Sequence, residues 1–260
     1  MSKATRHRNA RERLAEERRR QEQRGRRLRA VLVSGGAVLV IGIVVAAVVL
    51  MRSGGDDGEA TATAPLTRQA DGSVVMAQPG VSGPVLEIYE DFQCPACQKF
   101  EEATGKTIKE LAAEGKVKVV YRPFSLFREW PEPTKGNSAR ALNASLCAPA
   151  DKWIAYHDRL FAEQGPENSK GFENDDLVGW AKEVGITGAA FEGCVRGAEK
   201  EPMIAQANAA ATKAGVQSTP WVTLNGRKLD QNEAFTAAGL RKAVENAPDT
   251  ATTSPATSSG

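Results

Sequence analysis

The pattern of apolar and polar positions predicts a strand, a helix and a second strand before the midpoint of the chain. Two short apolar runs, 85–92 and 117–121, are rich in β-branched and aromatic side chains and predict buried strands. Between them, apolar residues recur every three or four positions from Phe100 to Leu111, which predicts a helix that ends near Gly115. Two strands joined by a helix favour a right-handed crossover and parallel pairing.

Farther along, the pattern becomes mainly helical. Residues 134–215 carry several apolar stripes at helical spacing, which predict a helical insert. A short apolar run at 221–224 predicts another strand, and Asn225-Gly226 directly after it is a strong hairpin signal. Residues 235–244 predict a closing helix.

The beginning of the chain has a different composition from the rest. Net charge is +2 overall, but residues 1–30 hold 12 Lys and Arg against 4 Asp and Glu, a net of +8, so the remainder carries −6. Residues 31–51 contain no charge, and as a helix they would span roughly 30 Å, the thickness of a bilayer core. This predicts a single transmembrane helix with a cytoplasmic basic arm and an extracytoplasmic remainder. A weak cleavage-site match at Ala60-Thr61-Ala62 leaves removal of the anchor open.

Two polar segments flank the predicted domain at 81–247. Residues 52–80 are rich in Gly, Ala, Thr and Asp and predict a flexible linker, although Val74–Met76 allows a first edge strand. Residues 248–260 are too polar to fold and predict a disordered tail. The basic arm at 1–30 interleaves Glu with Arg, as a solvated helix does, and membrane topology accounts for it, so we expect no nucleic-acid binding.

Candidate chemistry centres on Cys94 and Cys97, which are separated by two residues where the first strand gives way to the helix. Cys94 falls at the predicted N-cap, with Pro95 at the first helical position. A thiolate there meets unpaired N–H groups and the positive end of the helix dipole, so we expect a lowered pKa for Cys94. The pair therefore indicates a redox-active dithiol. Half of a zinc site is the alternative, but Cys147 and Cys194 stand alone and supply no second close pair.

The order of elements, the Cys-x-x-Cys motif and a downstream Thr219-Pro220 before a strand hairpin resemble the thioredoxin superfamily. The long helical insert resembles its DsbA branch, and most of all the membrane-anchored DsbA-like proteins of mycobacteria and other actinobacteria. The resemblance covers about residues 70–246. It rests on three segments: Tyr89–Cys97, Ala155–Phe161 and Ser218–Gly226.

This resemblance implies a thioredoxin fold with a helical insertion, in which Cys94 is the nucleophile and Cys97 the resolving cysteine. It also implies a cis bond at Thr219-Pro220, opposite Cys94, that presents backbone to an extended client peptide. Three aromatic residues are candidates for lining the client groove, with ordinary core packing as the alternative: Phe92, Phe124 and Trp221.

The sequence departs from the family pattern at two places. Thioredoxin and DsbA carry a buried carboxylate six residues before the first cysteine, a position that Ile88 occupies here. In the family this carboxylate aids proton transfer at the second cysteine. Glu90 lies on the same face of the strand and is a candidate substitute in the shell around the cysteines; the alternative is that water moves the proton. The second departure is the dipeptide between the cysteines, Pro-Ala, which lacks the histidine of DsbA, so we expect a pair that is less oxidising than that of DsbA.

His157 lies in the apolar stripe of its helix and predicts a packed, satisfied histidine.

Cys147 and Cys194 are the remaining cysteines. Four cysteines allow three pairings. If Cys94 pairs with Cys97, the other two can form a structural disulfide, which would persist outside the membrane. Two unrelated buried thiols are the alternative.

These observations predict a membrane-tethered, extracytoplasmic thiol–disulfide oxidoreductase that acts on exported cysteine-containing proteins. The resemblance implies a membrane re-oxidase of the VKOR or DsbB kind as partner. The chain calls for no cofactor beyond its redox disulfide and for no metal. A reductase or isomerase of the same fold and a non-catalytic binding module are the alternatives. A cysteine hydrolase is more distant, because only His157 could serve as its base.

Overall fold

The computed structural model describes residues 63–249 of the 260-residue chain. The predicted basic arm, the predicted span at 31–51 and the predicted tail beyond residue 249 lie outside the described residues. Within 63–249, no helix combines the length and apolar character needed to cross a bilayer. The prediction of a membrane anchor therefore stays a prediction.

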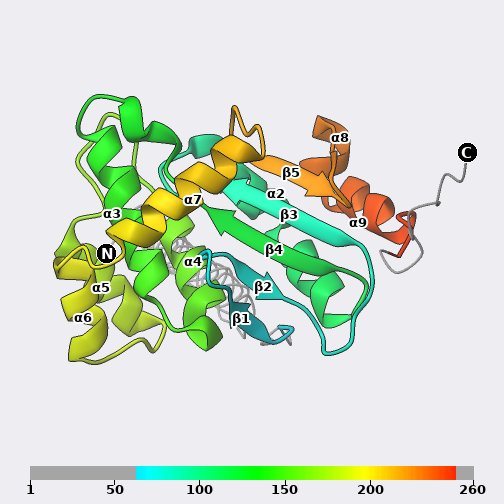
Figure 1. Cartoon of the computed structure of the whole chain (residues 1–260), viewed down its shortest axis with the longest axis horizontal. Helices are drawn as coiled ribbons and strands as arrows, with labels where there is room; N and C mark the ends of the chain where they lie inside the picture. The colour runs from blue at the N-terminus through cyan, green and yellow to red at the C-terminus, as the bar shows by residue number, and fades with distance from the viewer. Residues whose placement is uncertain (1–62, 250–260) are drawn as a thin grey trace, which may run out of the picture. The chain divides into compact units, whose positions relative to one another are not determined.

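A six-stranded mixed sheet forms the centre of the described fold, in the order β1-β2-β4-β3-β5-β6 (Figure 1). Strands β3 and β4 are parallel, as the crossover predicts, and the other neighbouring pairs are antiparallel. In the register, Ile88 of β3 lies between Tyr121 of β4 and Val222 of β5, so β3 is an inner strand with neighbours on both sides. The strands are β1 (Leu66–Arg68), β2 (Val74–Met76), β3 (Val85–Glu90), β4 (Lys118–Pro123), β5 (Trp221–Leu224) and β6 (Arg227–Lys228).

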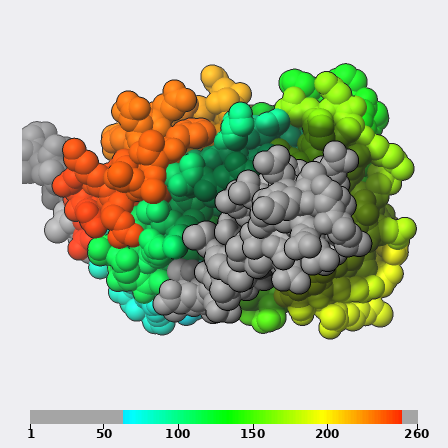
Figure 2. Space-filling model, turned by 180° about the vertical axis from the view of Figure 1, so that it is seen from behind, coloured from blue at the N-terminus to red at the C-terminus, as the bar shows by residue number. Residues whose placement is uncertain are grey.

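Helix α2 follows β3 and leads back to β4, and it packs against the C-terminal helix α9. Helices α3 to α6 gather beyond one end of the sheet, and α7 runs back toward β5 (Figure 1). Seen from behind, α2 lies between the C-terminal helices and the insert (Figure 2). The helices are α2 (Pro95–Ala113), α3 (Thr134–Cys147), α4 (Trp153–Ala162), α5 (Asn174–Glu183), α6 (Ala189–Arg196), α7 (Glu201–Lys213), α8 (Gln231–Ala234) and α9 (Ala237–Glu245), with short 3₁₀ helices η1 (Leu126–Glu129) and η2 (Ala150–Lys152).

The prediction of a flexible linker over 52–80 is wrong for its described part. Strands β1 and β2 both join the sheet, and the side chains of Val74 and Met76 are fully buried. The edge strand is β1 rather than β2, because β2 pairs with β1 on one side and β4 on the other. Each strand has only three residues, too few to show an alternation, and the Gly, Asp and Pro residues around them are typical of spacers.

The predicted hairpin after β5 is confirmed. Asn225 and Gly226 have φ values of 50° and 77°, the left-handed conformation that a tight primed turn requires. The Asn225 side chain also accepts a hydrogen bond from the Val85 N–H, at 2.8 Å, which ties the turn to the start of β3. The hairpin thus fixes β5 against the strand that leads to the cysteines.

Candidate active site

Cys94 lies where the chain turns from β3 into α2. The Cys94 N–H donates to the carbonyl of Asp91 at 2.9 Å and closes the turn. Cys94 is the N-cap of α2, in an extended conformation, and Pro95 begins the helix without needing an N–H partner. The side chain of Cys94 caps no N–H of the helix, so its sulfur is free for other contacts.

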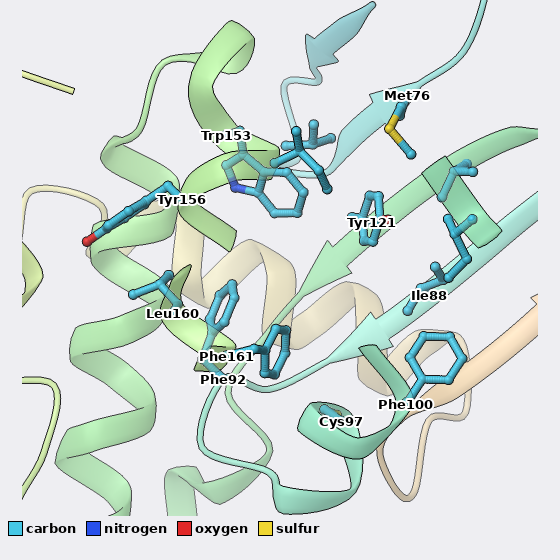
Figure 3. Packing of buried hydrophobic residues seen from close by; sticks show 14 of the residues in the cluster. Met76, Ile88, Phe92, Cys97, Phe100, Tyr121, Trp153, Tyr156, Leu160 and Phe161 are labelled. Carbon is cyan, nitrogen blue, oxygen red and sulfur yellow. The ribbon is translucent and has the colours of Figure 1, made fainter. Parts of the chain in front are cut away.

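Cys97 lies one helical turn farther on and is fully buried, whereas 7% of Cys94 is exposed. Both thiols are reduced in this structure. The Cys97 N–H donates to the Cys94 carbonyl at 3.0 Å, which holds the first turn of α2 together. In Figure 3, Cys97 lies among the buried side chains beneath the sheet, with Phe100 one turn along. Cys94 is therefore the more accessible of the two sulfurs.

The two thiols have opposite pKa shifts. A hydrogen bond from the Cys97 thiol, together with the N–H groups of Cys97 and Ala96, lowers the pKa of Cys94 to about 6 against the opposing effect of burial. Burial raises the pKa of Cys97 well above its ordinary value, and the neighbouring Cys94 adds to this effect. At neutral pH the outer sulfur is therefore a thiolate and the inner one a thiol, which is the division between attacking and resolving cysteines.

The loop before β5 lies directly against the outer sulfur. The Thr219-Pro220 peptide bond is cis, as the resemblance implies. The Thr219 carbonyl oxygen lies 3.6 Å from the Cys94 sulfur. Because β5 pairs with β3, the sheet itself brings this loop beside the turn that carries Cys94.

A hollow of about 290 Å³ adjoins this loop, and its lining differs from the predicted groove. Phe92 and Phe124 are buried, with 1% and 3% exposed, and pack in the core, so their assignment to a client groove is wrong. Trp221 is half-buried beneath the ammonium group of Lys228, which lies 3.5 Å from the ring centroid, and its role stays a prediction. The hollow is lined instead by Ala96, Ser218, Thr219, Pro220, Val222, Lys228, Leu229, Asp230, Gln231, Ala234 and Phe235. A larger hollow of about 630 Å³, beside the β5–β6 turn and α9, contains neither cysteine.

Glu90, at the end of β3, and His157, in α4, form a wholly buried pair. The Nε2 atom of His157 lies 2.8 Å from Oε1 of Glu90, and its Nδ1 lies 3.3 Å from Oδ1 of Asp158. Burial disfavours the imidazolium, but the two carboxylates outweigh it and raise the pKa of His157 to about 10. The prediction of a packed, satisfied histidine is confirmed, and its partner is Glu90, the candidate substitute for the buried carboxylate of the family.

A metal ion is the alternative occupant to test for this cluster. Ligand atoms of Glu90, Glu101 and His157 all lie within 4.8 Å of one another. A histidine that binds a metal leaves one ring nitrogen unprotonated toward the ion. Here both ring nitrogens face carboxylates, an arrangement that suits a protonated imidazolium in an ion pair better than a metal ligand.

Asp91 is a buried site residue that the sequence reasoning did not identify. Its carboxylate accepts hydrogen bonds from the N–H of Gln93 at 2.9 Å, the N–H of Leu126 at 2.7 Å and the hydroxyl of Ser138 at 2.6 Å. Burial raises its pKa to about 6 although these bonds oppose the shift. The carboxylate thus joins the turn before Cys94 to η1 and to α3. An Asp just after a predicted strand and two residues before Gln93 is a turn signal that could have indicated it.

Gln164, just beyond α4, makes a second connection between the insert and the active-site turn. Its side-chain amide donates to the carbonyl of Phe92 at 2.6 Å and to that of Cys94 at 3.1 Å. Such backbone contacts leave no trace in the hydropathy pattern. The insert therefore holds the turn from two sides, through Asp91 and through Gln164.

Cys147 and Cys194 form a disulfide that joins α3 to α6, with an S–S distance of 2.02 Å and Cα atoms 6.0 Å apart. The alternative of two unrelated thiols is therefore wrong. This disulfide belongs to the insert, whereas Cys94 and Cys97 lie on α2 and its N-cap. The four cysteines thus divide into two separate pairs.

Comparisons with known proteins agree with this geometry. A family model described as Thioredoxin matches residues 82–246. Reduced DsbA from Mycobacterium tuberculosis is similar at 26% identity and a TM-score of 0.56, over 70% of this chain and 91% of that one. DsbG from the same organism has 26% identity and a TM-score of 0.56, over 69% and 85%. MdbA from Actinomyces oris, a thiol-disulfide oxidoreductase, shares the fold at 23% identity, a TM-score of 0.58 and coverage of 72% and 96%. A search of curated protein sequences found no match.

Proposed function

This chain belongs to the thioredoxin family and is a DsbA-like thiol–disulfide oxidoreductase, and we propose that it works as an oxidase that introduces disulfides into exported proteins. The observation that carries this proposal is the difference in pKa between the two thiols: the pKa of Cys94 is lowered to about 6, whereas burial raises the pKa of Cys97, one turn away, well above its ordinary value. A stabilised Cys94 thiolate favours the reduced dithiol over the disulfide, and this makes the disulfide form a stronger oxidant.

In the proposed reaction, a client thiolate attacks the Cys94 sulfur of the Cys94–Cys97 disulfide. The bond between the two enzyme sulfurs breaks, its electron pair stays on Cys97, and a mixed disulfide joins Cys94 to the client. A second client thiolate then attacks the client sulfur of that bond, and Cys94 leaves as a thiolate. The client loses two electrons and gains a disulfide, and the enzyme becomes the dithiol.

Client binding is proposed for the hollow beside Ala96 and Pro220. An extended client segment would pair with the backbone before Pro220 and bring its cysteine to Cys94, while a neighbouring side chain enters the hollow. The carbonyl of Thr219, 3.6 Å from the Cys94 sulfur, marks where that pairing would begin.

We further propose that the domain works outside the cell membrane, tethered by the predicted anchor at 31–51. A re-oxidase of the VKOR or DsbB kind would then return the dithiol to the disulfide. The Cys147–Cys194 disulfide supports this location, because such bonds persist in oxidising compartments.

The equilibrium between the reduced protein and glutathione tests the direction of electron flow. An oxidase requires a reduction potential between about −180 and −120 mV, the values of protein disulfide isomerase and DsbA. A potential near about −270 mV, that of thioredoxin, would overturn the oxidase in favour of a reductase. A non-catalytic module would be identified separately, because a Cys97→Ala variant would then trap no mixed disulfides with exported proteins in cells.

A further inference from the structure

Two glutamines exchange contacts across the boundary between the redox turn and the insert. The side-chain amide of Gln164 donates to the carbonyls of Phe92, at 2.6 Å, and Cys94, at 3.1 Å. A primary amide carries two N–H donors, so this one group satisfies both carbonyls. In the other direction, the side-chain amide of Gln93, the residue between those carbonyls, donates to the Gly165 carbonyl at 3.1 Å. We refer to these three hydrogen bonds as the glutamine clamp.

The loop that carries the clamp is itself tied to the insert. Residues 163–173 connect α4 to α5 without a helix or strand of their own. The side chain of Asn137 donates to the Ser169 carbonyl, and the guanidinium group of Arg140 donates to the Gly171 carbonyl, each at 2.8 Å. Asn137 and Arg140 lie three residues apart on α3, so one face of that helix holds the loop. The clamp therefore has a fixed base.

The Cys94 carbonyl is the point at which the clamp can affect the chemistry. It also accepts hydrogen bonds from the N–H groups of Cys97, at 3.0 Å, and Gln98, at 3.2 Å, which belong to α2. Those two bonds fix Cys94 relative to its own helix, whereas Gln164 supplies a donor from outside that helix. Pro95 has no N–H, so the peptide group between Cys94 and Pro95 is held through its carbonyl alone. Because Cys97 is fixed in α2, the clamp limits how far the Cys94 sulfur can move away from it.

We propose that Gln164 is a positioning residue that holds the Cys94 backbone in the geometry from which Cys97 closes the disulfide. The step concerned is the attack of the Cys97 sulfur on a mixed disulfide at Cys94. A bond forms between the two enzyme sulfurs, the bond from Cys94 to the bound thiol breaks, and that thiol leaves as a thiolate with the electron pair. The proton of the Cys97 thiol passes to water. Such an intramolecular attack is fast only when the reacting atoms are held close together and aligned.

This inference rests on the proposed function, because it adds a residue to the same redox site. Closure of the disulfide occurs in an oxidase that is being re-oxidised and also in a reductase that releases its product. The glutathione equilibrium of the wild type therefore tests the direction of electron flow, and the rate of closure tests only the clamp.

Rapid quenching of the full chain after mixing with oxidised glutathione separates attack from closure. Attack by Cys94 depends on the glutathione concentration, whereas closure by Cys97 does not. In Gln164→Leu, which keeps a side chain of similar size but has no donor, closure should slow about tenfold, since a misplacement of about 1 Å can cost about 10²-fold. Attack should stay within about threefold of the wild-type rate, because the pKa of Cys94 is set by the start of α2 and the Cys97 thiol.

Gln98→Leu is the matched control. The side chain of Gln98 donates to the carbonyl of Phe161 in α4 at 2.8 Å, so it crosses the same boundary but does not bond to the redox turn. Its replacement should lower the stability of the junction and leave closure at the wild-type rate. A loss of junction stability alone would therefore not reproduce the effect expected for Gln164→Leu.

Gln164→Glu tests the donor in a side chain of the same shape. At pH 7 the carboxylate only accepts hydrogen bonds and would face two carbonyls, so closure should be at least as slow as in Gln164→Leu. Near about pH 4 much of the carboxyl group is protonated and can donate again, so the ratio of wild-type to variant closure rates should fall. A normal closure rate in either Gln164 variant at pH 7, equal slowing in Gln98→Leu, or a ratio that does not change with pH would overturn the proposal.

Discussion

The two cysteine pairs of this protein have the same chemistry and opposite surroundings. Cys94 and Cys97 lie on one helix and its cap, where the start of the helix and the Cys97 thiol lower the pKa of the outer sulfur and the inner one is buried. Cys147 and Cys194 come from two different helices, α3 and α6, and join them by a disulfide. The comparison teaches that the position of a cysteine relative to a helix end decides its role. A thiol at a helix start becomes a leaving group, whereas a disulfide between helices becomes a cross-link.

Replacement of cysteines should show the largest difference in activity between the two pairs. Cys94→Ser should abolish oxidation of a fluorescent dithiol peptide, by more than about 10³-fold, because a hydroxyl forms no disulfide and the thiolate is the nucleophile. The matched double variant Cys147→Ser with Cys194→Ser should retain most of the wild-type rate below its unfolding temperature. Equal losses in both variants would show that the division into two pairs is wrong.

Removal of the cross-link should instead appear in stability. Loss of the Cys147–Cys194 disulfide should lower the free energy of unfolding by about 2–5 kcal/mol, as for other native disulfides. Urea denaturation of the double variant and the wild type, both with Cys94 and Cys97 oxidised, measures the difference. An unchanged midpoint would contradict a stabilising role.

Asp91 tests how the insert holds the redox turn. Asp91→Ala leaves the buried donors of Gln93, Leu126 and Ser138 without their acceptor, which should lower the free energy of unfolding by about 2–4 kcal/mol. Asp151→Ala, at an exposed site, is the control and should stay within about 0.5 kcal/mol of the wild type. Thermal unfolding of both variants measures the difference in stability. Equal stabilities of the two variants would contradict the role of Asp91 in holding the turn.

The buried His157 should make stability depend on pH in the oxidised protein, where Cys94 does not titrate. Its pKa is about 10 in the fold against 6.5 in the unfolded chain, so its contribution is complete below pH 6.5 and is lost as the pH rises through 10. The raised pKa of Glu101 likewise makes the free energy of unfolding fall as the pH rises, up to about pH 8. Urea unfolding at pH 6.5 and pH 9.5 should therefore show a loss that is smaller in His157→Gln. An increase with pH would contradict the buried ion pair.

Local pattern was enough for much of the fold and for the reactive cysteines. The periodicity from Phe100 to Leu111 and the position of Pro95 predict α2, and Asn225-Gly226 predicts the hairpin. Strands β1 and β2 were not predictable in this way, because three residues show no period and their place depends on pairing with β4.

The surroundings of the cysteines depend on contacts distant in sequence. The pairing of Glu90 with His157 joins residues 67 positions apart, and local sequence pattern leads to a separate interpretation of each. Aromatic side chains such as Phe92 and Phe124 are candidates for an apolar groove, but both are buried in the fold. Phe92, for example, packs against Phe161 of the insert, with ring centroids 5.0 Å apart. Packing between segments, which no local pattern contains, decided these assignments.

The central claim is that Cys94 is a thiolate at neutral pH, and the pH dependence of its alkylation tests this most directly. In the reduced protein, the rate of reaction with iodoacetamide should reach half of its maximum near pH 6, with Cys97 unreactive over the same range. In Cys97→Ala the midpoint should move upward, because the hydrogen bond from the Cys97 thiol is lost. A wild-type midpoint near pH 9, the ordinary value for a thiol, would contradict the account.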